Sequence, residues 1–183
     1  MKFSHYLKRV EESSEFKEFR EKHKKAYVCA GFFVLDFENK KDIHQIDFLI
    51  PKKNKIATFT LHDGIQVKIS EPIKMKKKLE RLELKEDTNT DIDALKGIVH
   101  DEMLNRTVTG EIKKIIAVLQ SQEGRKVWNL NCITGDLGII KVHVDDKTSN
   151  ILEFEKASLF DFVKMIPKSA LGNIGENQKL SKK

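Results

Sequence analysis

The stretch KVWNLNCITGDLGIIKVHVDDKTSNILEF, residues 126–154, decides the fold, because its apolar residues alternate with polar ones over three successive runs. Side chains alternate between the two faces of a β-strand, so each run predicts a strand with one buried face. The strands are expected at 126–134, 139–144 and 151–155, and the short segments between them are rich in residues that favour turns. The sequence therefore predicts an antiparallel ribbon of three strands.

Turn chemistry selects the register of the first hairpin in this ribbon. A two-residue turn would place Lys141 and His143 in the core, against the apolar pattern. A three-residue loop over 136–138 pairs Cys132 with Val142 and ends on glycine, which tolerates a left-handed conformation. We therefore predict the three-residue loop and an inward set made of Trp128, Leu130, Cys132, Ile140, Val142 and Val144.

The next turn follows the same reasoning. A loop centred on 147–149 puts Leu152 and Phe154 on the same face as Val144. The ribbon would then end on an inward-facing aromatic side chain.

A similar order of elements is expected in the first part of the chain. Apolar spacings of three and four predict an amphipathic helix over 3–23, with Ser14 as a candidate cap for a second piece. Four strands should follow as a meander, with a bulge or close backbone approach near Ala30 and Gly31. These strands are expected at 26–37, 43–50, 56–61 and 65–69.

The rest of the chain is predicted to contain further helices. Residues 72–90 are dense in charge and predict an exposed helix followed by a polar linker. Helical spacing indicates helices over 91–105 and 111–122, and an amphipathic helix over 158–166. Residues 168–183 have little to bury and are expected to form a flexible basic tail.

Together these elements predict an α+β fold of two tandem helix–antiparallel β-meander (α-β-β-β) repeats, with the helices packed on one face of the sheets. The expected domains are 1–71 with a helix and four-strand meander, 72–90 as a charged helix or linker, 91–167 with helices and a three-strand repeat, and 168–183 as tail. The sequence leaves open whether the two repeats form one sheet or two.

Residues 113–152 resemble the PepSY domain. The matching features are an aromatic near the start of one strand, Val-Asp at the end of the next, Lys-Thr in the turn and a β-branched residue after it: Trp128, Val144, Asp145, Lys147, Thr148 and Ile151. Where the family usually has glycine this chain has Ser149, so Asn150 is expected to adopt the left-handed conformation instead. The resemblance implies an α+β fold and a non-catalytic role in binding or restraining protein partners, peptidases among them.

Composition is typical of a soluble globular protein, with 39% hydrophobic and 34% charged residues and a net charge of +6. No apolar run reaches the length of a membrane span or of a signal peptide, so a cytoplasmic protein without membrane association is expected. In a reducing compartment Cys29 and Cys132, which lie in apolar runs, are expected to be buried free thiols.

No spacing typical of a metal site or a catalytic centre is found, so neither a cofactor nor a metal is expected, and the protein is not expected to be an enzyme. An enzyme whose residues converge only in three dimensions stays an alternative. A histidine beside an aspartate at a strand end could line a pocket, and a lysine cluster could contact phosphates. The candidate binding residues are His62, Asp63, Lys74, Lys76, Lys77, Lys78, Arg81 and His143.

We therefore expect a non-catalytic cytoplasmic binding or regulatory module whose partner is a protein or a peptide, held on a concave surface or by strand addition. The alternative is a nucleic-acid- or ribosome-associated basic factor that uses the lysine cluster at 74–81 and the C-terminal lysines. The oligomeric state is left open.

Overall fold

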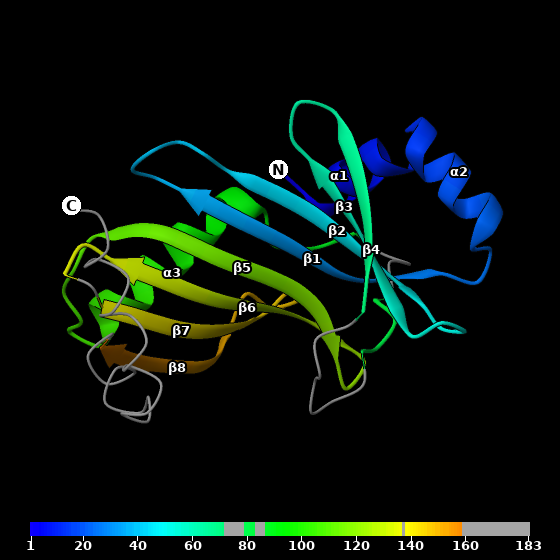
Figure 1. Ribbon diagram of the computed structural model, residues 1–183. Helices are drawn as coiled ribbons and strands as arrows, with labels where there is room; N and C mark the ends of the chain where they lie inside the picture. The colour runs from blue at the N-terminus through cyan, green and yellow to red at the C-terminus, as the bar shows by residue number, and fades with distance from the viewer. Residues whose placement is uncertain (72–78, 83–86, 137, 159–183) are drawn as a thin grey trace, which may run out of the picture.

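The computed structural model describes residues 1–71, 79–82, 87–136 and 138–158. Within these residues the chain forms one antiparallel sheet of eight strands with three short α-helices, so the protein is mostly β with a few helices (Figure 1). The helical elements are α1 (Phe3–Glu11), α2 (Ser14–Lys22), a 3-10 turn (Ile92–Ala94) and α3 (Leu95–Asn105). The strands are β1 (Tyr27–Asp36), β2 (Ile43–Ile50), β3 (Lys55–Leu61), β4 (Ile65–Ser70), β5 (Ile112–Gln122), β6 (Arg125–Thr134), β7 (Gly138–Asp145) and β8 (Ile151–Ser158).

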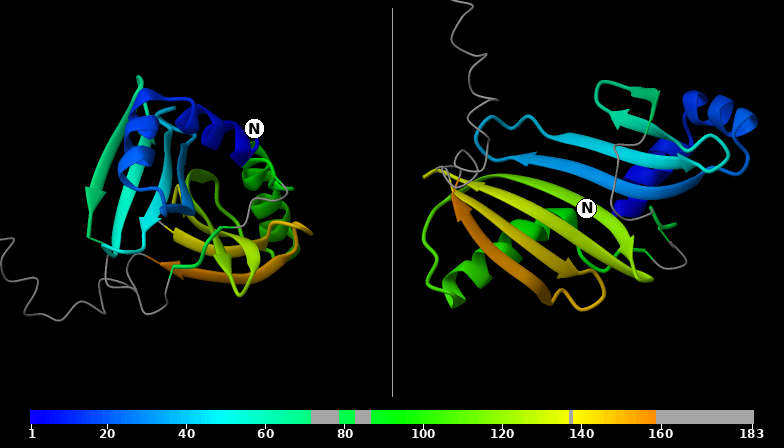
Figure 2. Two further views of the ribbon diagram at one scale, coloured as in Figure 1. Left: turned by 90° about the vertical axis from the view of Figure 1, so that its right-hand side faces the viewer. Right: turned by 60° about the horizontal axis from the view of Figure 1, so that its bottom comes forward.

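The strand order is β4-β3-β2-β1-β5-β6-β7-β8, so two four-stranded meanders meet at β1 and β5. At that junction Val34 pairs with Ile116 in an antiparallel register. The sheet curves strongly, and α1 and α3 lie on its concave side (Figure 2). The strands of the two halves therefore form one sheet.

One apolar core lies between the concave face and the helices. A Cβ atom added to Gly31 would lie 2.4 Å from the ring of Phe3, so glycine allows α1 to lie directly on β1. This confirms the close approach expected there, and a bulge falls between Val28 and Ala30. The helices place these buried residues in the core: Phe3, Tyr6, Val10, Phe16, Phe19, Leu95, Val99 and Met103.

Helix α2 begins at a serine cap and packs through its aromatic residues. The backbone N–H of Phe16 donates to the hydroxyl of Ser13 at 3.1 Å, so the predicted division of the first helix is confirmed, with Ser13 as the cap in place of Ser14. The Phe16 ring lies 5.1 Å from that of Phe48 and 5.6 Å from that of Phe59. These contacts fix α2 above β2 and β3.

The expected architecture of two tandem α-β-β-β repeats with helices on one face is wrong. The main error lies at 111–122, where a helix was predicted and the structure has strand β5. The spacing of Ile112, Ile115 and Leu119 fits a helix, but β5 is a central strand with apolar side chains on both faces, and such runs carry no clean alternation. Residues 123 and 124 then form a tight turn in place of a helix end, both with positive φ.

In the β6–β7 hairpin the inward set is confirmed but the register differs by two residues. Cys132 pairs with Ile140, not with Val142, and Gly138 is the first residue of β7 rather than a left-handed loop residue. The alternation of apolar and polar residues determines only which face of a strand is buried. A shift of the register by two residues leaves the same side chains on the buried face. The hydroxyl of Thr134 donates to the carbonyl of Gly138 at 3.2 Å and so closes the loop in the observed register.

The β7–β8 turn also departs from its expected form. A bulge between residues 143 and 144 pairs Val144 with Ile151. Leu152, expected to face inward, is 50% exposed, whereas Phe154 packs against the core as expected. Ser149 rather than Asn150 adopts the left-handed conformation, with φ 57°.

A buried carboxylate ties the segment before α3 to the sheet. Asp146 is 1% exposed and accepts hydrogen bonds from Trp128 Nε1 at 2.9 Å and from the backbone N–H groups of Asn89 and Thr90. Buried polar groups are stabilising only when they are paired in this way. The network fixes where the chain enters α3.

Several predicted elements fall partly or wholly outside the described residues. They are the C-terminal helix after residue 158, the tail 168–183, and residues 72–78 and 83–86 of the charged segment. Residues 79–82 are described and are not helical. The backbone N–H of Leu82 donates to Val28 O at 2.9 Å, and its side chain is buried.

The end of α3 provides a test of backbone strain. Thr107 adopts φ 56°, the N–H of Val108 donates to Met103 O, and that of Thr107 to Leu104 O. This is a Schellman motif with threonine where glycine is preferred.

Thr107→Gly is expected to raise the free energy of unfolding by about 1 kcal/mol, measured by urea denaturation. Thr109→Gly, without a positive φ, should give no gain; equal effects of both variants would contradict the explanation.

Candidate functional site

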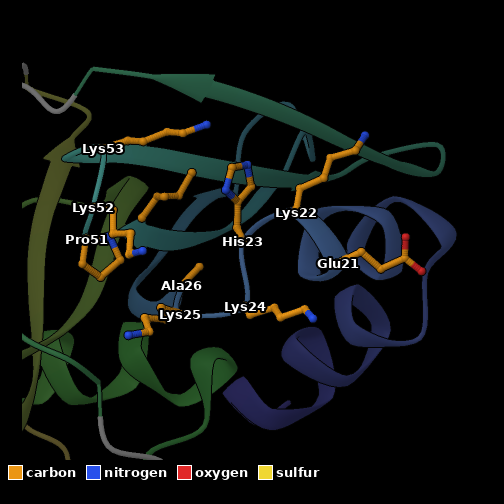
Figure 3. Close-up of a pocket in the computed structure, with 10 residues that line it drawn as sticks. Glu21, Lys22, His23, Lys24, Lys25, Ala26, Pro51, Lys52 and Lys53 are labelled. Atoms are coloured by element: carbon orange, nitrogen blue, oxygen red, sulfur yellow. The ribbon is translucent and has the colours of Figure 1, made fainter.

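A pocket of about 310 Å³ lies between the α2–β1 connection and the β2–β3 turn (Figure 3). Positively charged side chains dominate it, and we call it the basic pocket. It is lined by Glu21, Lys22, His23, Lys24, Lys25, Ala26, Ile50, Pro51, Lys52 and Lys53.

Strand pairing brings the two walls of the basic pocket together. Tyr27 at the start of β1 pairs with Leu49 near the end of β2, so the residues before the one strand lie beside those after the other. The guanidinium of Arg20 donates to the carbonyl of Ala26 at 2.7 Å and holds the first wall. The second wall is a tight turn, in which Asn54 takes a left-handed conformation with φ 47°.

The charge of the basic pocket is nearly all of one sign. Of its lining residues five are lysines, and Glu21 is the one carboxylate. Within the described part of the chain none of these five lysines forms an ion pair with a carboxylate. Ammonium groups gathered around a concave surface create a local positive potential that attracts anions. The pocket therefore has the electrostatics of an anion site.

His23 lies inside this positive field. Its ring packs on Phe19 at 5.0 Å between centroids, and Figure 3 shows it between Lys53 and Lys22. Partial burial lowers the pKa of the imidazole below its ordinary value, and the charges of those two lysines lower it further. His23 is therefore neutral at pH 7, and a bound anion would favour its protonation.

The chemistry of the lining residues suits the binding of an anion. They supply hydrogen-bond donors and positive charge, but no cysteine, serine or threonine beside a base. A pair of carboxylates for acid–base chemistry is also missing from the lining. The arrangement can hold an anionic group.

A larger groove of about 780 Å³ continues from the basic pocket and shares Lys24, Lys25 and Ala26 with it. Arg81 lines this groove, with its guanidinium 5.8 Å from the centre of the Tyr27 ring. Of the candidate residues predicted from sequence, Arg81 is thus brought next to the pocket lysines.

The other candidate residues lie elsewhere. His62 and Asp63 form the exposed β3–β4 turn, with His62 Nε2 3.3 Å from Asp63 Oδ2, at the opposite end of β3 from the pocket. His143 lies on β7, where its Nδ1 is 2.9 Å from Glu153 Oε2. Lys74, Lys76, Lys77 and Lys78 are outside the described residues.

The lysines of the basic pocket were missed because sequence reasoning favoured the longest basic run. The pocket is built instead from two shorter runs, KHKK at 22–25 and KK at 52–53. Their positions in the sequence could have indicated the site, because one run precedes a predicted strand and the other follows the strand expected to pair with it. Only the pairing of β1 with β2 makes them one site.

The two cysteines do not form a reactive centre. Cys29 and Cys132 are buried and unpaired by a disulfide. Burial raises the pKa of each thiol to about 12. Within the described residues no group of three or more His, Cys, Asp or Glu side chains is placed to bind a metal ion. A Cys–His nucleophile or zinc site at these cysteines therefore has no support in the geometry.

Thiol reactivity tests this conclusion. Folded protein at pH 8 should react with a disulfide reagent about a hundredfold more slowly than protein unfolded in urea, because both thiols are protonated and shielded. Unfolding should release two reactive thiols, the number in the sequence. One fast-reacting thiol in the folded protein would contradict this and reopen a nucleophilic role.

No helix in the described residues is both long and apolar enough to cross a bilayer. None of the family models compared matches the chain, and no curated protein matches its sequence. The fold is similar to the crystal structure of a "putative lipoprotein" from Clostridium difficile 630. The TM-score is 0.52 and the identity 14%, over 78% of this chain and 90% of that one. This likeness concerns the fold alone, and the resemblance of 113–152 to the PepSY domain stays a prediction.

Proposed function

We propose that the protein is a non-catalytic binding module whose basic pocket holds the carboxylates of an acidic segment in a protein or peptide partner. The observation that carries the proposal is the group of five lysines without ion-pair partners among the described residues, gathered around one concave site. Such an excess costs electrostatic free energy in the free protein, and an anionic partner offsets that cost.

The shape and lining of the basic pocket favour an acidic segment over nucleic acid. Proteins that bind single strands stack bases chiefly on Phe, Tyr and Trp side chains, and the pocket lining has none of these three, with His23 as its one aromatic ring. Its volume of about 310 Å³ suits a few side chains rather than a polynucleotide backbone. The nucleic-acid- or ribosome-associated role is therefore the second candidate, resting on the same positive charge.

Two sequence expectations belong to this proposal. The PepSY resemblance implies binding or restraint of protein partners, which fits a module without catalytic groups in its pocket. The cytoplasmic location expected from the sequence fits two buried free thiols, since reducing compartments keep cysteines unpaired. Both remain parts of the proposal.

Charge removal at the basic pocket tests the proposal directly. Lys52→Gln/Lys53→Gln should weaken binding of a fluorescein-labelled hexaglutamate peptide by about tenfold at low salt, because two favourable charge contacts are lost. Fluorescence anisotropy measures the affinity. The matched control is Lys40→Gln/Lys41→Gln, an adjacent pair in the β1–β2 connection, which should bind as wild type does.

Two results would count against the acidic-segment proposal. One is equal binding by the pocket variant and its control. The other is tighter binding of a single-stranded oligonucleotide of equal charge, lost in the pocket variant and falling steeply with salt, which would favour the nucleic-acid role.

Protonation of His23 provides a separate pH test. Its folded-state pKa lies below the ordinary 6.5, so the added positive charge is gained only as pH falls below that value. Glutamate side chains stay ionised down to about pH 5. Hexaglutamate affinity should therefore rise by about threefold between pH 7.5 and 5.5. His23→Gln should keep the affinity at pH 7.5 and lose the rise; an unchanged rise would show that another group titrates.

A further inference from the structure

Strand β4 forms one end of the sheet, and none of the other described strands lies along its outer edge. It pairs with β3 on one side, and no strand of the described residues pairs with its other side. Residues 66–70 are all exposed. The opposite edge strand, β8, carries three charged residues that discourage pairing, Glu153, Glu155 and Lys156, whereas β4 carries only Lys68. Of the two edges, β4 is the less protected against an added strand.

Two apolar side chains lie at this open edge. Val67 pairs with Phe59 and Ile69 with Ala57, so both occupy the helix-covered face of the sheet. They are nevertheless 39% and 46% exposed, because no further strand lies beside them. An extended segment added to β4 would cover them with its own alternate side chains.

The end of β4 lies at the same end of the sheet as the turn that forms one wall of the basic pocket. Ser70 pairs with Ile56, and Lys55 Nζ lies 3.0 Å from Glu71 Oε1. Lys55 follows directly on the turn that carries Lys52 and Lys53, so the C-terminal end of β4 lies at the same end of the sheet as this wall of the pocket, with β3 between them. The carboxylate of Glu71 is paired with Lys55 and does not add an unpaired negative charge there.

We propose that an extended partner segment pairs antiparallel with the outer edge of β4, while acidic residues at its N-terminal end occupy the basic pocket. The direction follows from the fold. β4 runs toward the pocket, so a strand antiparallel to it starts at the pocket and runs away. The partner motif is a short run of acidic residues followed by alternating β-branched residues. This inference rests on the proposed function and adds the binding mode of the same partner.

Backbone methylation of the ligand tests strand pairing without altering the protein. The probe is a peptide of three glutamates followed by alternating valine and threonine, Glu-Glu-Glu-Thr-Val-Thr-Val-Thr. Alternate N–H groups of an added strand face the edge, so methylating one alternate set should weaken binding by about tenfold or more and methylating the other set should not.

Protein variants at the edge complete the test. Val67→Thr/Ile69→Thr keeps β-branched residues and should weaken binding of the probe by about fivefold by removing apolar cover, with hexaglutamate binding unchanged. Ile43→Thr is the control, because Ile43 is 40% exposed on β2 and lies outside both the pocket and the β4 edge.

The outcomes separate the two proposals. If both methylated probes and the edge variant bind as their parents do, while Lys52→Gln/Lys53→Gln loses binding, the strand-pairing inference is overturned and the pocket function stands. If the lysine variant also binds normally, both are overturned. Concentration-dependent self-association that Val67→Thr/Ile69→Thr abolishes would show that a second copy occupies the edge, and would likewise overturn the inference.

Discussion

The pairing of β1 with β5 is the contact on which the rest of the structure depends. Residues 30–36 run antiparallel to 114–120 at the centre of the sheet and join the two meanders into one surface. The joined sheet curves so that α1 and α3 share one concave side. The core is therefore common to both halves, with Phe33 of β1 against Trp128 of β6 at 6.0 Å between ring centres.

The basic pocket depends on the same central strand. Because β1 continues the chain from α2 and pairs with β2, it brings the residues that end α2 beside the turn that follows β2. Gly31 lets α1 lie close above, and the Phe16–Phe48 contact holds α2 in place. The backbone that carries the lysines is thus placed before any anion binds, which lowers the ordering cost of binding.

Much of the sheet could be predicted from sequence, and what was missed has a physical cause. Strands with one buried face, such as β2 with Ile46, Phe48 and Ile50, show clean alternation and were placed correctly. β5 was assigned to a helix because a central strand is apolar on both faces. The pocket escaped prediction because its charges come from connections whose proximity follows from pairing alone. The pattern of a single sequence predicts well which face of a strand is buried, but it predicts strand register poorly. It gives almost no information on which distant segments lie close together.

The central pairing also shapes how the chain must acquire its structure. Each meander forms by pairing of strands that are adjacent in the sequence. The pairing of β1 with β5 can form only later, because β2, β3, β4, a long connection, the 3-10 turn and α3 lie between them in the sequence. During synthesis the first meander emerges before β5 does. The edge of β1 (Tyr27–Asp36) that later pairs with β5 is then uncovered. Closing so long a loop is slow, and an uncovered hydrophobic edge is prone to pairing with other chains. A nascent chain of this fold is thus most exposed to aggregation after β1 has been synthesised and before β5 pairs with it.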